Sequence, residues 1–312
     1  MRVGIIGLGD IALKAYLPVL AQCKGIELVL CTRNSDVLHE VAKQYRIKEY
    51  CTDYHSLPMM KVDAVMIHAA TSAHFNIASY FLKQGIATFV DKPLSDTFHQ
   101  VEQLYSLSHQ HSAPLYVGFN RRHIPLFNQH IPELQQSAAG NLTSLRWEKH
   151  RHDLPGELKT YIFDDFIHPL DSINLNSQST LDDLAITHQM DGQLLTRLDV
   201  QWQAQGALLH ASMNRNFGVT CERVQAVYNN KVIEFDSFVE GKVWQGNNQS
   251  HISLKDWTPM LTSKGFEAMI LDWFNVIQKG TVNQTIIDRN IASHELAEAI
   301  YQKITKQIVS RF

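Results

Sequence analysis

One lysine of the sequence stands where it could polarise an oxygen atom. Lys92 lies in the run Asp91-Lys92-Pro93, which directly follows a short β-rich stretch. An ammonium group at the end of a buried strand can donate a hydrogen bond to a substrate oxygen and stabilise negative charge that develops there. Pro93 would stiffen the backbone that aims it. By spacing alone, a surface lysine before a helix explains the same residues, so both interpretations stay open.

A carboxylate and an imidazole form a second candidate pair. Asp164 and His168 are four residues apart, so in a helix they share a face, where the carboxylate can orient the imidazole or favour its protonated form. Histidine titrates near neutral pH, which suits general acid and base catalysis. Pro169 disfavours helical geometry at His168, so the pair can also lie across a helix start. The alternative is a helix-start acid with a structural histidine.

A glycine-rich turn near the N-terminus could bind a phosphate group. The apolar run 3–6 leads into Gly7-Leu8-Gly9-Asp10-Ile11-Ala12, and a helix-like stretch follows. The order strand, GxGxxA, helix is the dinucleotide-binding fingerprint, in which small residues let the backbone approach a pyrophosphate at the start of a helix. Ordinary strand-to-helix turns also contain glycines. The turn nevertheless predicts a nicotinamide dinucleotide cofactor held by residues 7 and 9–12.

The residues at the expected end of the second strand bear on whether the cofactor is NAD(H) or NADP(H). A dinucleotide fold that takes NAD usually has an acid about 20 residues after the glycines, where it binds the ribose 2′-hydroxyl. Here the segment reads Cys31-Thr32-Arg33-Asn34, with no carboxylate. The Arg33 guanidinium, beside the Thr32 hydroxyl, suits a 2′-phosphate. The segment favours NADP(H) over NAD(H), and a solvated arginine in a loop is the alternative.

The elements that would position these groups alternate between strands and helices up to about residue 120. Strands are expected at 3–6, 27–32, 64–67, 88–90 and 115–118, with helices at 12–22, 35–45, 73–84 and 97–109. This alternation is typical of βαβ units and a parallel sheet. We therefore expect an α/β chain whose N-terminal domain, residues 1–120, is a Rossmann domain.

The pattern changes in the remaining residues. Residues 120–180 are mixed, whereas 184–254 are dominated by strand-like runs separated by turn signals, and two helices are expected at 265–278 and 289–308. We expect residues 121–312 to form an α+β domain with a large open, mainly antiparallel sheet. Its open face is expected to be apolar and to be used for self-association as a homodimer or higher homo-oligomer.

Composition excludes several classes of function. The formal net charge of -3 provides no basic surface for nucleic acid, and no apolar stretch approaches the ~20 residues that cross a bilayer. The expected first strand begins at residue 2, which leaves no room for a signal peptide, so a cytoplasmic protein is expected.

Cysteines and histidines do not form a recognisable metal site. Four cysteines lack CxxC spacing and are expected to be reduced, buried thiols: Cys23, Cys31, Cys51 and Cys221. The close histidine pairs His109/His111 and His150/His152 lack further ligands at metal spacing. We interpret both pairs as surface histidines and expect no bound metal.

Taken together, the motifs resemble the glucose-fructose oxidoreductase, inositol dehydrogenase and rhizopine catabolism (Gfo/Idh/MocA) family. The resemblance rests on Gly7 to Ala12, Ala70-Thr71-Ser72-Ala73-His74, Asp91-Lys92-Pro93, Gly118-Phe119-Asn120-Arg121-Arg122 and Asp164xxxHis168, in this order. The short chain and the wording around Asp91 and Asp164 are similar to the MviM-type "virulence factor" branch. The family pairs a Rossmann domain with an α/β domain whose open sheet often forms an oligomer interface, and its members mostly oxidise or reduce sugars, inositols and related polyols with NAD(P).

The resemblance also implies roles for single residues. Lys92 matches the lysine of the family's EKP motif, and Asp164 with His168 matches its catalytic pair. Asp91 departs from the usual glutamate, which keeps the charge and shortens the reach. Asp91 and Lys92 are also expected to contact the cofactor. The remaining matches are likewise to cofactor contacts: Thr71 and His74 to the loop that covers the cofactor, and Asn120 and Arg121 to the crossover segment near the nicotinamide and substrate.

These features predict an NAD(P)-dependent oxidoreductase, with NADP favoured, that acts on a sugar, inositol or related polyol or carbonyl compound. His168 would accept or donate the proton, Lys92 would polarise the oxygen and Asp164 would orient His168. A cofactor-binding sensor without turnover is the alternative from another class. Reduction of an unsaturated or non-sugar substrate on the same scaffold is a third, because fold does not fix function.

Overall fold

The computed structural model describes residues 1–136 and 138–310, which form two compact units. The first unit contains Met1–Asn120 and Phe266–Asn283, and the second contains Arg121–Gly265 and the residues from Gln284 onward. From the sequence we expected all of 121–312 in the second domain, whereas the structure groups 266–283 with the first unit. Residues 137, 311 and 312 of that expected domain lie outside the described residues.

The first unit is built around a six-stranded parallel sheet with the order β3-β2-β1-β4-β5-β6. The strands are β1 (Arg2–Ile6), β2 (Glu27–Cys31), β3 (Glu49–Cys51), β4 (Ala64–Ile67), β5 (Ala87–Asp91) and β6 (Leu115–Gly118). Its helical elements are η1 (Ala12–Tyr16), α1 (Leu17–Leu20), α2 (Ser35–Tyr45), η2 (Tyr54–Ser56), α3 (Thr71–Leu82), α4 (Phe98–Gln110) and α10 (Phe266–Lys279). This strand order is that of a doubly wound dinucleotide-binding sheet.

Local sequence explains most of these elements. Strands β4 and β5 are buried at every position, which is typical of central strands in a parallel sheet. Helix α2 begins where the Asn34 side chain accepts hydrogen bonds from two backbone N–H groups, and it ends at Arg46, whose φ is 56°. Strand β3 was not expected, because it is a three-residue edge strand with mostly exposed side chains.

Helix α10 shows why residues 266–283 belong to the first unit. Trp273 is fully buried and its ring lies 5.6 Å from that of Tyr116 and 6.0 Å from that of Phe89. The Tyr116 hydroxyl also donates a 2.8 Å hydrogen bond to Asp272. Burial of such an aromatic side chain contributes several kcal/mol to the free energy of unfolding, of order 3–5 for Trp→Ala. No local sequence pattern predicts this packing.

The second unit contains an eight-stranded sheet with the order β14-β13-β12-β11-β7-β10-β9-β8. Its strands are β7 (Ser144–His150), β8 (Ala185–Asp191), β9 (Leu194–Ala204), β10 (Ala207–Asn214), β11 (Cys221–Tyr228), β12 (Lys231–Phe235), β13 (Glu240–Gln245) and β14 (Asn248–Ser253). Its helical elements are η3 (Asn120–His123, which begins on the last residue of the first unit), α5 (Pro125–His130), α6 (Glu133–Gln136), α7 (Leu158–Thr160), η4 (Tyr161–Phe166), α8 (Ile167–Ile173), α9 (Met260–Ser263) and α11 (Gln284–Val309). The sheet is antiparallel except that β7 and β10 run parallel, and β7 was not expected from the sequence.

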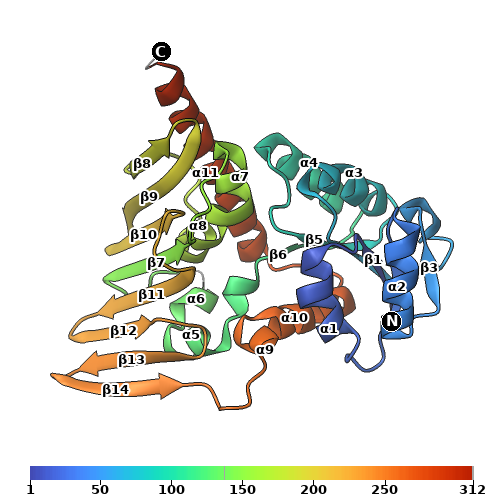
Figure 1. Cartoon of the computed structure of the whole chain (residues 1–312), viewed down its shortest axis with the longest axis horizontal. Helices are drawn as coiled ribbons and strands as arrows, with labels where there is room; N and C mark the ends of the chain where they lie inside the picture. The colour runs from blue at the N-terminus through green and yellow to red at the C-terminus, as the bar shows by residue number, and fades with distance from the viewer. Residues whose placement is uncertain (137, 311–312) are drawn as a thin grey trace. The chain divides into compact units, whose positions relative to one another are not determined.

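The two faces of this sheet differ in chemistry. Its inner face packs on α8, which α11 also contacts, and Figure 1 shows α7, α8 and α11 on one side of the strands. The outer face carries no helix of the described part of this unit, and its side chains are mostly polar: Arg146, Glu148, Arg197, Asp199, His210, Gln225 and Glu234. The expectation of an apolar open face is therefore wrong, because strand alternation directs the apolar residues inward.

Within the described residues, no helix combines the length and apolar character that crossing a membrane requires. The four cysteines are free thiols.

Candidate active site

The glycine turn of the first unit connects β1 to η1. Gly7 has φ +89°, and a Cβ at this position would lie 2.7 Å from the backbone nitrogen of Ala69. Only glycine fits there. A Cβ on Gly9 would meet no atom within 4 Å, so the backbone at Gly9 borders open space. Asp10 and Ile11 are exposed, whereas Ala12 is buried.

The end of β2 carries the residues expected at the ribose. Thr32 is half-buried and Arg33 is exposed. The Asn34 side chain is used by helix α2, since its Oδ1 accepts from the N–H groups of Asp36 and Val37 at 3.0 and 3.2 Å. Arg33 is therefore the cationic group at this strand end.

Asp91 ends β5 and is held by buried hydrogen bonds. Its Oδ1 accepts from the Tyr16 hydroxyl at 3.1 Å and from the Lys92 backbone N–H at 2.8 Å. The Nδ1 atom of His68 lies 3.9 Å from its Oδ2. Burial acts to raise the pKa of this carboxyl, but hydrogen bonding and charge from His68 and Lys92 outweigh it and lower the pKa. Asp91 thus fixes the backbone from which Lys92 projects.

His74 ties two loops of the first unit together. Its Nδ1 lies 2.8 Å from the carbonyl oxygen of Pro93, and its Nε2 lies 2.9 Å from that of Ala69. Burial lowers the pKa of this imidazole. Thr71 is the first residue of α3, so the segment expected to cover the cofactor begins where this helix begins. Asn120, the last residue of the first unit, is buried.

The predicted catalytic pair lies in the second unit, on one helical segment formed by α7, η4 and α8. Glu157 caps its start by accepting from the N–H groups of Lys159 and Thr160. Asp164 is exposed in the π-helical turn η4, and His168 is 5% exposed in α8. His168 and Pro169 are both helical, so the helix does not start between the pair. Turns of π-helix are rare and occur frequently at functional sites.

Sequence reasoning missed a buried ionic cluster beside this segment. The carboxylate of Asp165 is contacted by Lys149, Arg151 and Arg215. Arg121, expected near the nicotinamide and substrate, donates to Glu222 within the second unit, at 3.3 and 3.0 Å. The residues concerned stand apart in the sequence, and only the doublet Asp164-Asp165 and the run Lys149-His150-Arg151 could have indicated the cluster.

The predicted site residues therefore fall into two sets. The glycine turn, the β2 end, Lys92, Thr71 and His74 belong to the first unit, and Arg121, Asp164 and His168 belong to the second. Within the described residues, no group of three or more His, Cys, Asp or Glu side chains could hold a metal ion. His150 is a correction to the sequence analysis: it is buried, stacks on Phe217 and accepts a hydrogen bond from the Asn214 N–H.

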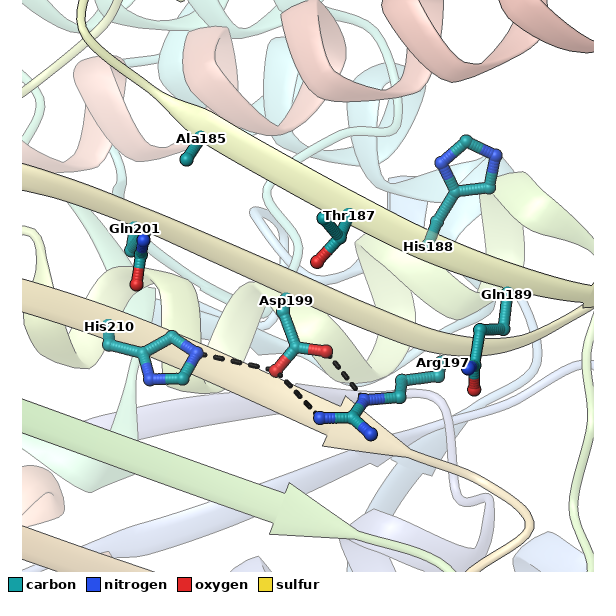
Figure 2. A pocket seen from close by; sticks show the side chains of 8 residues that line it. All are labelled: Ala185, Thr187, His188, Gln189, Arg197, Asp199, Gln201 and His210. Atoms are coloured by element: carbon teal, nitrogen blue, oxygen red, sulfur yellow. Dashed lines mark hydrogen bonds and ion pairs between the residues drawn. The ribbon is translucent and has the colours of Figure 1, made fainter.

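A separate pocket of about 460 Å³ opens on the outer face of the sheet, over β8, β9 and β10. Figure 2 shows Asp199 at its centre, bound by Arg197 and His210. Burial acts to raise the pKa of Asp199, but hydrogen bonds from His210, Arg197 and Ser212 lower it. The charged side chains drawn in this pocket are thus paired with one another, and none of the predicted site residues lines the pocket.

Comparison with known proteins decides the family. A model described as "Oxidoreductase family, NAD-binding Rossmann fold" matches residues 1–119, and one described as "YceM-like, C-terminal domain" matches residues 131–245. A crystal structure of a Gfo/Idh/MocA family oxidoreductase from Vibrio cholerae is 59% identical, with a TM-score of 0.98 and 99% coverage of both chains. This chain belongs to the Gfo/Idh/MocA family. The expected family, fold class and enzyme class are thereby confirmed.

Three further relatives of this Gfo/Idh/MocA oxidoreductase have lower sequence identity to it than the Vibrio cholerae protein. The dehydrogenase MviM from Clostridium difficile is 26% identical, with a TM-score of 0.83 and coverage of 100% of this chain and 99% of that one. The YceM protein of Salmonella typhimurium is 28% identical over 97% of both chains. The UDP-N-acetylglucosamine 3-dehydrogenase of Acidithiobacillus ferrooxidans is 27% identical over 55% of this chain and 52% of that protein.

Proposed function

We propose that this oxidoreductase transfers hydride between NADP(H) and a sugar, inositol or related polyol or carbonyl compound. The observation that carries the proposal is that the glycine turn and Lys92 lie at the same edge of the first unit's sheet. Gly7 follows β1 and Lys92 follows β5, and since β1, β4 and β5 are parallel neighbours, both residues lie at the carboxyl edge. Ligands of doubly wound sheets bind at that edge.

The residues present fit a bound NADP(H). The open space at Gly9 and the backbone of residues 7–12 would hold the pyrophosphate, and Thr32 with Arg33 would hold the 2′-phosphate. Asp10 and Ile11 are exposed beside this turn. When bound, the cofactor supplies a hydride donor or acceptor.

The protein's own side chains would then handle the substrate oxygen and its proton. The Lys92 ammonium donates a hydrogen bond to that oxygen and stabilises negative charge on it. His168 accepts the hydroxyl proton during oxidation and returns it during reduction, while Asp164 orients the imidazole. Asp91 and His74 hold the backbone around Lys92, Thr71 begins the helix expected to cover the cofactor, and Asn120 with Arg121 leads into the second unit.

Relatives support the substrate class. The relative from Acidithiobacillus ferrooxidans is named as a dehydrogenase of a sugar nucleotide, and it covers about half of this chain. Lys92, Asp164 and His168 are all present here, which favours turnover over cofactor sensing.

The test is a screen of sugars, uronates, aldonates, inositols and their phosphates, with NADP and NAD separately, followed as absorbance at 340 nm. We expect NADP-linked turnover of at least one compound. Tight NADPH binding without turnover across the panel would instead support the sensor function.

We further propose that the outer face of the second unit's sheet mediates self-association. This face is open within its unit, and Leu208 on β10 is 46% exposed there. Light scattering at micromolar concentration should show a dimer or higher oligomer, and Leu208→Lys should lower the mass. A wild-type monomer would contradict this.

A further inference from the structure

Three cations gather where two parallel strands of the second unit end. Strands β7 and β10 are parallel neighbours, so their carboxyl ends lie at the same edge of the sheet (Figure 1). Lys149 is near the end of β7, Arg151 follows that strand, and Arg215 follows β10. The Arg151 N–H donates to the Asn214 carbonyl at 2.9 Å, which joins the two strand ends.

All three cations contact one carboxylate, that of Asp165. Arg151 donates to it through Nε and Nη2 at 2.9 and 2.8 Å, and Arg215 donates through Nη2 at 3.0 Å. Lys149 forms an ion pair with the same group. One carboxylate therefore faces three basic side chains, and positive charge remains in excess.

A second carboxylate, that of Glu222, does not remove this excess. Glu222 lies opposite Lys149 in the sheet register, but it accepts both hydrogen bonds from the Arg121 guanidinium. The pair of Arg121 and Glu222 is neutral as a whole. Even if the exposed Asp164 is counted with the cluster, the basic side chains still outnumber the carboxylates.

This excess is held in a buried place, where charge without a counter-ion is costly. The side chains of Lys149 and Arg215 are 4% and 7% exposed. Burial and repulsion from Arg121 lower the pKa of Lys149 to about 7. The Nε of Arg215 is buried and has no hydrogen-bond partner among the described residues.

The cluster is also close to the proposed proton-transfer group. Asp165 precedes His168 by three residues on one helical segment, a separation of about one turn, or ~5 Å along the axis. The Arg151 side chain is 33% exposed, far more than its two partners. Because Asp165 takes its Nε and Nη2, the Nη1 edge of its planar guanidinium remains to receive an anion.

We propose that the substrate carries a carboxylate or phosphate group, and that Arg151 is the residue that binds it and selects for it. The inference rests on the proposed dehydrogenase function for its reacting carbon and adds a charged substituent to the substrate class. A uronate, an aldonate or a sugar phosphate has this chemistry, whereas a free hexose or inositol lacks it.

Matched compounds test the proposal on the wild-type protein with NADP bound. Glucose, glucuronate and glucose 6-phosphate form one set, and galactose and galacturonate form another. We expect kcat/KM or, without turnover, the calorimetric affinity to be about 10- to 100-fold higher for the anionic member of a set. The carboxylate and phosphate arms show which anion is preferred. Equal values for neutral and anionic members would overturn the proposal.

Arg151→Gln should abolish this preference and leave the neutral compounds unaffected, and Arg151→Lys should restore part of it. Asp165 keeps Lys149 and Arg215 as partners in both variants, so the melting temperature should stay near that of the wild type. Lys306→Gln, an exposed cation on α11, is the control that retains the preference. A preference that survives in Arg151→Gln would contradict the assignment to Arg151.

Calorimetry separates this inference from the proposed function. Binding of an anion should raise the pKa of Lys149, so binding near pH 7 should be accompanied by proton uptake from the buffer. Arg151-dependent binding with proton uptake but no turnover would uphold the inference and contradict the dehydrogenase proposal. Turnover of neutral and anionic sugars at equal rates would do the reverse.

Discussion

The candidate residues of the two units differ in what holds them in position. In the first unit, backbone conformation dominates: Gly7 has a positive φ, and the end of β5 is fixed by hydrogen bonds to Asp91. In the second unit, buried charged side chains dominate, with Asp165 at the centre of three cations. A backbone site depends on a few residues adjacent in sequence, whereas an ionic site depends on residues brought together by the sheet.

The neighbouring residues Asp164 and Asp165 offer the largest contrast within the second unit. Asp165→Asn leaves three buried or half-buried cations without their carboxylate and should cost about 3–5 kcal/mol of unfolding free energy. Asp164→Asn changes an exposed side chain and should cost less than about 0.5 kcal/mol. Denaturant titration of both variants measures this difference.

For turnover, in contrast to stability, we expect Asp164→Asn to have the larger effect of these two substitutions. Because Asp164 is proposed to orient His168, Asp164→Asn should lower kcat about tenfold or more while the protein remains folded. Equal stability of the two variants would contradict the expectation that the ion pairs of Asp165 stabilise this unit.

The glycine turn allows a similar contrast within the first unit. Gly7→Ala places a Cβ 2.7 Å from the Ala69 nitrogen at positive φ, so it should cost about 2 kcal/mol or more and abolish cofactor binding. A Cβ at Gly9 meets no protein atom, so Gly9→Ala should leave the melting temperature unchanged and weaken NADPH binding by about 10- to 100-fold. Normal NADPH affinity in Gly9→Ala would argue against a pyrophosphate at this turn.

The two units also differ in how much of their structure could be predicted from the sequence. The Rossmann sheet and Lys92 carry signals within short segments, so their positions were predictable. The position of strand β7 was not predictable. Its inward-facing side includes Lys149 as well as Trp147, while Arg146 and Glu148 face outward, so hydrophobic and polar residues do not alternate regularly along it. The cluster at Asp165 depends on the parallel pairing of β7 with β10, and helix α10 on aromatic packing with Phe89 and Tyr116.

A smaller effect is expected at the end of β2. Arg33 is the cation there and no acid stands in 31–34, so NADPH should bind more tightly than NADH. Arg33→Ala should reduce the ratio of the two affinities by about tenfold, with little change in the melting temperature. Fluorescence titration with both cofactors measures the ratio, with Lys43→Ala on α2 as the control. Tighter NADH binding by the wild type would refute the 2′-phosphate assignment.

The central claim is the proposed dehydrogenase function, in which Lys92 polarises the substrate oxygen and His168 transfers its proton. Its most direct test is kcat for Lys92→Met and His168→Asn with the substrate that the screen identifies. The account predicts a loss of about 10²–10⁴ in kcat for each variant, with NADPH affinity and melting temperature close to wild type. Near-normal turnover in either variant would contradict the role given to that residue, and near-normal turnover in both would contradict the account.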